Sequence, residues 1–74
     1  MTKIRDKELI LAFGKKVKEI RIKKGVSQYQ LSYDSDIPRS QVVRIENGEV
    51  NTTISSAMAL AKALNVSINK LFDT

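Results

Sequence analysis

Large apolar side chains recur near the start of the chain with the period of an α-helix. Their spacing is four, four and three residues: Leu9, Phe13, Val17 and Ile20. Residues so spaced share one helix face, so the pattern predicts a helix over about 7–24 with this stripe turned inward. Gly25 then follows two lysines. Cations suit the last carbonyls of a helix and glycine adopts a left-handed backbone, so this is where the helix should end.

Two short helices are predicted next, over about 28–34 and about 38–46. Ser27 is a suitable N-cap for the first, whose apolar anchors are Leu31 and one of its two tyrosines. Pro38 stands at or near the first position of the second helix, where its missing N–H costs little. Helices this short are unstable alone, so neighbouring elements must hold them.

A fourth helix is predicted over about 54–64, with Thr53 as its N-cap and Asn65 at its end. Five of its residues are expected to face inward: Ile54, Ala57, Met58, Ala61 and Leu64. Ser67 can cap a last short turn, which carries three apolar residues: Ile68, Leu71 and Phe72.

No segment alternates like a strand over a useful length, so the predicted fold is all-α, a compact five-helix bundle. Its 74 residues are expected to form a single domain, residues 1–74, with residues 1–5 frayed. The chain has no cysteine and no histidine, which excludes disulfides and removes the usual ligands of a structural zinc site. Stability must therefore come from packing, with or without a partner subunit.

The charge of the chain indicates which kinds of partner it can bind. The net charge is +5, and the segment KKVKEIRIKK (15–24) holds six basic residues and one acid. Basic domains often meet phosphate or acidic lipid, although a charge run alone fits a solvated helix face equally well. A membrane-surface role lacks a free apolar face, because the stripe of the first helix is needed for the core.

Other classes of function find little support. No apolar run approaches the length of a membrane span and the start lacks a signal-peptide core, so a cytoplasmic protein is expected. Histidine and cysteine are absent, the carboxylates are scattered and no glycine-rich phosphate loop occurs, so we expect neither an enzyme nor a bound cofactor.

The segments 28–34 and 38–46, joined by a turn of about three residues, have the layout of a helix-turn-helix. Two such helices pack crosswise, and Ser32 is the small residue available at the crossing point. Asp36 stands where the turn needs a left-handed residue, which aspartate tolerates better than most.

The second of these helices has two unlike faces. Val42 and Ile45 are predicted to face inward, which turns another set outward, with Gln41 on a flank: Arg39, Ser40, Val43 and Arg44. Arginine can grip guanine O6 and N7 with two hydrogen bonds, and a valine methyl can meet the thymine methyl. A solvated helix is the plain alternative for this face; the basic charge and the paired short helices favour DNA.

Four segments of the sequence resemble the helix-turn-helix domains of phage repressors and Cro proteins, the XRE family: FGKKVKEIR (13–21), GVSQYQLS (25–32), DIPRSQVVRIENG (36–48) and TISSAMALAKALNVSINKLF (53–72). The chain departs from the family pattern at four positions of the second helix, the turn and the start of the fourth helix: Ser32, Tyr33, Asp36 and Thr52. None of these departures touches the outward face of the 38–46 helix.

The resemblance implies a sequence-specific transcriptional regulator, most often a repressor, that binds an inverted repeat of double-stranded DNA as a dimer. It implies that Arg39, Ser40 and Arg44 read bases, with Gln41 and Val43 as secondary contacts. It also implies that Gln28 contacts a phosphate and braces the reading helix, that Asn47 bonds a phosphate, and that Arg21 and Glu46 form a buried ion pair. A plain surface cation is the alternative for Arg21.

Further contacts follow from the residues themselves. Lys24 and Thr52 are candidate phosphate contacts, whereas Thr53 is better explained as an N-cap. Four large apolar residues near the end are candidates for a dimer interface, with ordinary core as the open alternative: Leu60, Ile68, Leu71 and Phe72. By family analogy, a controller of a mobile element, a restriction–modification system or a toxin–antitoxin pair fits. An antitoxin or adaptor that chiefly binds another protein remains the alternative function.

Overall fold

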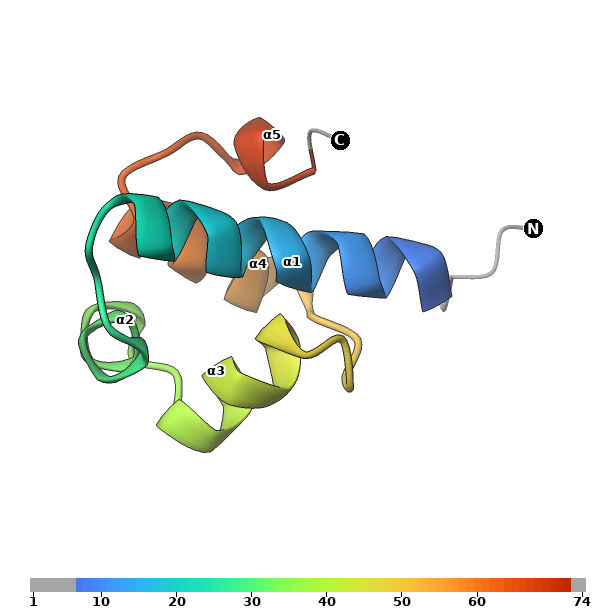
Figure 1. The fold of residues 1–74 in the computed structure, drawn as a ribbon, viewed down its shortest axis with the longest axis horizontal. Coiled ribbons are helices and arrows are strands. Elements are labelled where there is room, and N and C mark those ends of the chain that lie inside the picture. The colour runs from blue at the N-terminus through green and yellow to red at the C-terminus, as the bar shows by residue number, and fades with distance from the viewer. Residues whose placement is uncertain (1–6, 73–74) are drawn as a thin grey trace.

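The computed structural model describes residues 7–72, which fold into five helices: α1 (Lys7–Lys23), α2 (Gln28–Ser35), α3 (Arg39–Glu46), α4 (Ile54–Ala63) and α5 (Ile68–Leu71). α1 crosses the whole molecule, with α5 on one side of it and α2 and α3 on the other, while α4 lies behind it (Figure 1). The described residues contain no strand, so the all-α prediction is confirmed. The predicted frayed start, residues 1–5, lies outside the described residues.

One hydrophobic core joins the helices. Its largest fully buried side chains come from every helix: Val17, Leu31, Val42, Ile45, Leu60, Leu64 and Leu71. Burying an aliphatic side chain of this size stabilises a fold by about 1.5–3 kcal/mol, so each of these residues contributes substantially to the stability of the domain. Each short helix thus holds at least one anchor in the core, which explains how helices too short to persist alone are stable here.

Three predicted inward residues are exposed, and those predictions were wrong. Leu9 lies near the free end of α1, which projects past α3 and α4, and is 49% exposed. Ile54 and Met58 are 80% and 57% exposed. The buried stripe of α4 consists of Ala57, Leu60, Ala61 and Leu64, which leaves Ile54 and Met58 one turn apart on the adjacent flank.

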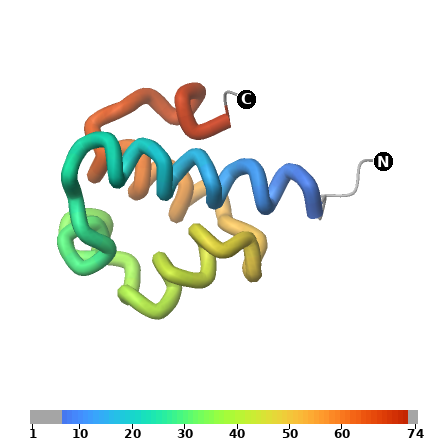
Figure 2. Tube along the Cα trace, viewed as in Figure 1, coloured from blue at the N-terminus to red at the C-terminus, as the bar shows by residue number. Residues whose placement is uncertain are grey.

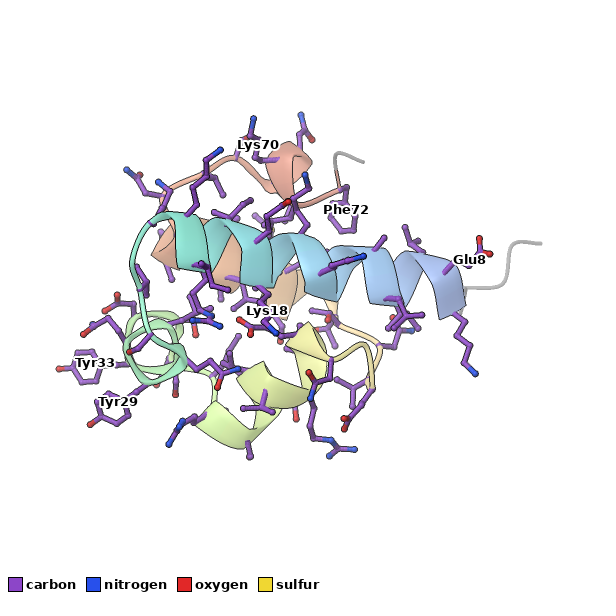
Figure 3. All side chains as sticks on the ribbon, in the orientation of Figure 1. Glu8, Lys18, Tyr29, Tyr33, Lys70 and Phe72 are labelled. Atoms are coloured by element: carbon purple, nitrogen blue, oxygen red, sulfur yellow. The ribbon has the colours of Figure 1, made fainter. Side chains whose placement is uncertain are left out.

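The prediction that a tyrosine anchors α2 in the core was also wrong. Tyr29 and Tyr33 are both exposed and project from α2 away from the body of the molecule (Figure 3). Each stands two residues from Leu31, and two residues along a helix turn a side chain to nearly the opposite face. The buried residues of α2 are instead Leu31 and Ser35.

The predicted caps are largely present. The Ser27 hydroxyl accepts from the Gln30 N–H at 2.9 Å, and the Thr53 hydroxyl accepts from the Ser56 N–H at 3.1 Å. Ser67 precedes α5 without a side-chain bond of this kind. Pro38 is the N-cap of α3 rather than its first helical residue.

Gly14 allows α1 and α3 to approach closely, a role that no local pattern of residues predicts. A Cβ at this position would lie 2.1 Å from the carbonyl oxygen of Ile45 and 2.9 Å from that of Glu46. Both distances are far below van der Waals contact, so only glycine fits without a shift of backbone. The C-terminal end of α3 is thereby fixed against the middle of α1.

Candidate nucleic-acid interface

α2 and α3 cross each other over a tight turn. α2 is seen nearly end-on where α3 runs across the view (Figure 2). The Ser32 hydroxyl donates to the carbonyl oxygen of Ile37 at 2.6 Å, and the Ile37 N–H donates back to the carbonyl oxygen of Ser32 at 3.3 Å. Asp36 adopts φ 61° and ψ 30°, the left-handed conformation expected of it. These contacts fix how α3 stands relative to α2.

The two faces of α3 divide as its periodicity predicts. Val42 and Ile45 are 1% exposed and pack into the core, and Ile37 in the preceding turn is also buried. On the opposite face Arg39, Ser40 and Arg44 are exposed and Val43 is half-buried, while Gln41 on the flank is also half-buried. The helix therefore presents two arginines and a hydroxyl to the outside on a rigid, core-anchored support.

A buried ion pair holds the C-terminal end of α3. Arg21 Nε donates to Glu46 Oε2 at 2.6 Å, and Arg21 Nη2 donates to Glu46 Oε1 at 3.1 Å. The Glu46 side chain is wholly buried and that of Arg21 is 11% exposed. A third guanidinium nitrogen, Nη1, donates to the carbonyl oxygen of Val26 at 2.9 Å. Arg21 is thus a largely covered structural residue and not a surface cation.

Gln28 completes this network from the start of α2. Its amide Nε2 donates to Glu46 Oε1 at 3.0 Å, so one carboxylate joins the end of α1, the start of α2 and the end of α3. An ionised carboxylate only accepts hydrogen bonds, which requires the amide nitrogen of Gln28 to face Glu46. The bracing role expected of Gln28 therefore has a definite partner, and this bond uses one of the two N–H groups on the amide nitrogen.

The other predicted phosphate contacts lie in different surroundings. Asn47 is exposed at the C-cap of α3, close to the outward arginines in sequence. Lys24 is exposed in the link between α1 and α2. Thr52 is half-buried and lines an apolar groove with Phe13 and Phe72, which is a packed setting rather than an open polar one.

One residue beside this surface was not among the predicted contacts. Glu49, in the link between α3 and α4, lies 3.8 Å from Arg44 Nε and accepts from Asn47 Nδ2 at 3.4 Å. Its role depends on the way the chain folds back after α3. A glutamate in a polar run gives no signal of that in the sequence.

The candidate dimer residues fall into two groups. Leu60 and Leu71 are 0% and 1% exposed, so they belong to the core and have no surface to offer a second subunit. Ile68 is half-buried, and Phe72 is exposed on one side while its ring packs on Phe13 at a centroid distance of 5.0 Å. Phe72 lies on the α5 side of the molecule, across α1 from α3 (Figure 3).

Within residues 7–72 no three acidic, histidine or cysteine side chains gather closely enough to hold a metal ion. None of the helices in this part of the chain has the length and hydropathy to cross a membrane.

The comparisons with known proteins agree with this geometry. A helix-turn-helix family model matches residues 17–71. The chain is 36% identical to control protein C.BamHI of Bacillus amyloliquefaciens over 64 residues, which cover 85% of this chain and 79% of that protein. It is 40% identical to control protein C.SmaI of Serratia marcescens over 55 residues, which cover 74% and 66%.

A solved structure extends the likeness to three dimensions. The crystal structure of the restriction-modification controller protein C.AhdI from Aeromonas hydrophila superposes with a TM-score of 0.83 at 35% identity, covering 85% of this chain and 96% of that one. Family match, relatives and fold agree: the chain belongs to the helix-turn-helix family of the XRE type and is a DNA-binding transcriptional regulator, not an enzyme.

Proposed function

We propose that the protein is a controller of the restriction–modification type, which binds an inverted-repeat operator as a homodimer with α3 in the major groove. One observation carries the DNA-binding part: Arg39, Ser40 and Arg44 stand exposed on the face of α3 opposite its core anchors. The control proteins to which the chain is similar support the biological setting. We also propose that the protein is located in the cytoplasm, where it has access to the DNA. We propose that it acts as a repressor of transcription.

The roles within α3 follow from its orientation. Arg39 and Ser40 occupy the first turn, the end that enters the groove in this motif. Arg44 lies farther along the same face. Arginine pairs bidentately with guanine, serine bonds several bases, and Val43 can meet a thymine methyl. Gln41, on the flank, is a secondary contact.

Phosphate contacts would fix the register of this helix on the duplex. Gln28 can offer its second amide N–H to a phosphate while the first stays with Glu46. Asn47 and Lys24 are exposed and available for the same purpose. Thr52 is the weakest of the proposed contacts, because its surroundings are largely apolar.

A dimer would use the apolar surface that remains exposed at the C-terminal half. Ile54 and Met58 on α4 and Phe72 after α5 are large and exposed, and Ile68 borders the same groove as Met58. Exposed apolar patches of this kind are typical of association surfaces. Two-fold pairing would set half-sites about 34 Å apart.

The test begins with selection of bound sites from random duplexes by the full chain. A selected inverted repeat supports the proposal. The Arg39→Ala/Arg44→Ala variant should then lose specific binding and keep its fold by circular dichroism. Lys15→Ala/Lys70→Ala is the matched control: it removes two exposed cations from α1 and α5 and none from α2 or α3, and Lys70 lies across α1 from α3 (Figure 3).

Two outcomes would contradict the proposal. If the double-arginine variant binds the selected duplex undiminished, α3 is not the reading element. If no duplex is enriched and the chain instead captures a protein partner, the antitoxin or adaptor function is the better account.

A further inference from the structure

Glu49 contacts two of the residues proposed to touch DNA. Its Oε1 lies 3.8 Å from Arg44 Nε, and its Oε2 accepts from Asn47 Nδ2 at 3.4 Å. Each carboxylate oxygen thus serves a different one of these residues. A single acidic side chain therefore stands at the C-terminal border of the proposed reading surface.

The backbone at the end of α3 brings this carboxylate into place. Gly48 adopts φ 71°, and its N–H donates to the carbonyl oxygen of Ile45 at 3.0 Å. The Glu49 N–H donates to the carbonyl oxygen of Arg44 at 2.9 Å. This pair of bonds is the helix stop in which a left-handed glycine folds the chain back over the last turn. Glu49 is thereby fixed beside Arg44 by main-chain bonds, in addition to the side-chain contact.

Neither stability nor raw affinity accounts for an anion at this position. A negative charge at a helix C-terminus is unfavourable, because the last carbonyls already carry partial negative charge. Its pair with Arg44 is exposed, at 54% and 56% for the two side chains, and exposed pairs add little to stability. Near a DNA backbone a carboxylate repels phosphate. The contacts of Glu49 with Arg44 and Asn47 are therefore the remaining explanation for a carboxylate at this position.

We propose that Glu49 is a specificity-determining residue that positions Arg44 for base readout, an inference that rests on the proposed function. The carboxylate comes closest to Arg44 at the inner nitrogen Nε, 3.8 Å away, and we take the two terminal guanidinium nitrogens to be the ones that face the duplex. Those two nitrogens form the bidentate bond to guanine O6 and N7. An arginine without such a support pairs with any nearby phosphate, which raises binding to all sequences alike. Glu49 thus lowers non-specific affinity and raises discrimination.

The experiment compares Glu49→Gln with Glu19→Gln in the full chain. Glu19 is an exposed glutamate on α1 that pairs with Lys16 at 3.4 Å, so its substitution removes the same charge at another site. Dissociation constants are measured at one salt concentration for the duplex selected by the wild-type protein and for a shuffled duplex of equal composition. The ratio of the two constants is the specificity.

We expect both variants to bind the shuffled duplex somewhat more tightly. Only Glu49→Gln should lower the specificity ratio, by about three- to tenfold, part of what one bidentate base contact provides. In an Arg44→Ala background the same substitution should change the ratio no further, because Glu49 acts through Arg44. Melting temperatures of all variants report whether they fold.

The outcomes separate the inference from the function beneath it. If the wild-type protein discriminates and Glu49→Gln discriminates equally well, the inference is overturned while the proposed function stands. It is also overturned if Glu49→Gln lowers the ratio as much without Arg44 as with it. If the wild-type protein prefers no duplex, the proposed function fails and the inference fails with it.

Discussion

Two arginine–glutamate pairs meet at the C-terminal end of α3, and they differ mainly in burial. Arg21 and Glu46 are joined at 2.6 Å with the carboxylate wholly buried, whereas Arg44 and Glu49 lie 3.8 Å apart with both side chains about half exposed. Breaking a buried pair leaves an uncompensated charge in the core, while an exposed pair exchanges its partner for water. The buried arginine–glutamate pair therefore stabilises the fold on the inner side of α3, whereas the exposed pair on the outer side stays available to a ligand.

Glu46→Ala should have the largest effect on the fold. It leaves the Arg21 guanidinium buried without its carboxylate and removes the acceptor of Gln28, so we expect a loss of about 3–5 kcal/mol. For a domain of this size the melting temperature should fall by at least about 10 °C. Thermal and urea unfolding followed by circular dichroism measure it. If Glu46→Ala and Glu49→Ala had equal melting temperatures, the two ion pairs would not differ in their contribution to stability.

Gln28→Ala should cost less, about 1–2 kcal/mol, because Glu46 keeps both bonds from Arg21. The matched control is Gln30→Ala. Gln30 is exposed and donates to Asp34 at 2.8 Å on the surface of α2, so its loss should change the free energy of unfolding by no more than about 0.5 kcal/mol. Equal values for the two variants would mean that the amide of Gln28 contributes nothing to the network.

Arg44→Ala should show the opposite profile. We expect unfolding to change by no more than about 0.5 kcal/mol, because the side chain is exposed. Binding to the selected duplex should weaken about 5- to 150-fold, the value of one bidentate base contact of about 1–3 kcal/mol. Binding assays on selected and shuffled duplexes separate this loss from the general effect of one fewer cation. A large drop in melting temperature would place Arg44 among the structural residues.

The sequence predicted those features of the structure that depend on residues close together in the chain. The helix period of Val42 and Ile45 was enough to orient α3, and the serine and threonine caps marked where α2 and α4 begin. The left-handed turn at Asp36 also followed from local chemistry. Such features need only the neighbours within one or two turns, so a single sequence contains them.

The errors arose where a helix has more apolar residues than its core side can accept. α4 carries Ile54 and Met58 as well as Leu60 and Leu64, and the period alone does not say which stripe meets the other helices. The core took the stripe containing Leu60, which removed it from the dimer candidates and left Ile54 and Met58 outside. The tyrosine anchor expected in α2 failed for a different reason, because both tyrosines stand two residues from Leu31 and therefore lie on nearly the opposite face.

Contacts between segments far apart in the sequence could not be predicted without the family resemblance. The approach of Gly14 to Ile45 depends on how α1 crosses α3, and no local pattern reports a crossing. The pair of Arg21 and Glu46, 25 residues apart, was expected only because the sequence resembles the XRE family. Glu49 had neither kind of signal, and its contacts were found only in the folded chain.

The most direct test of the division between the two sides of α3 is a titration of isotopically labelled protein with the selected duplex, followed by NMR. We expect the largest chemical-shift changes at the N-terminal half of α3, at Arg44 and at the start of α2, and little change at the side chains of Arg21 and Glu46. Shift changes confined to α4 and α5, with the outward face of α3 unaffected, would contradict this expectation.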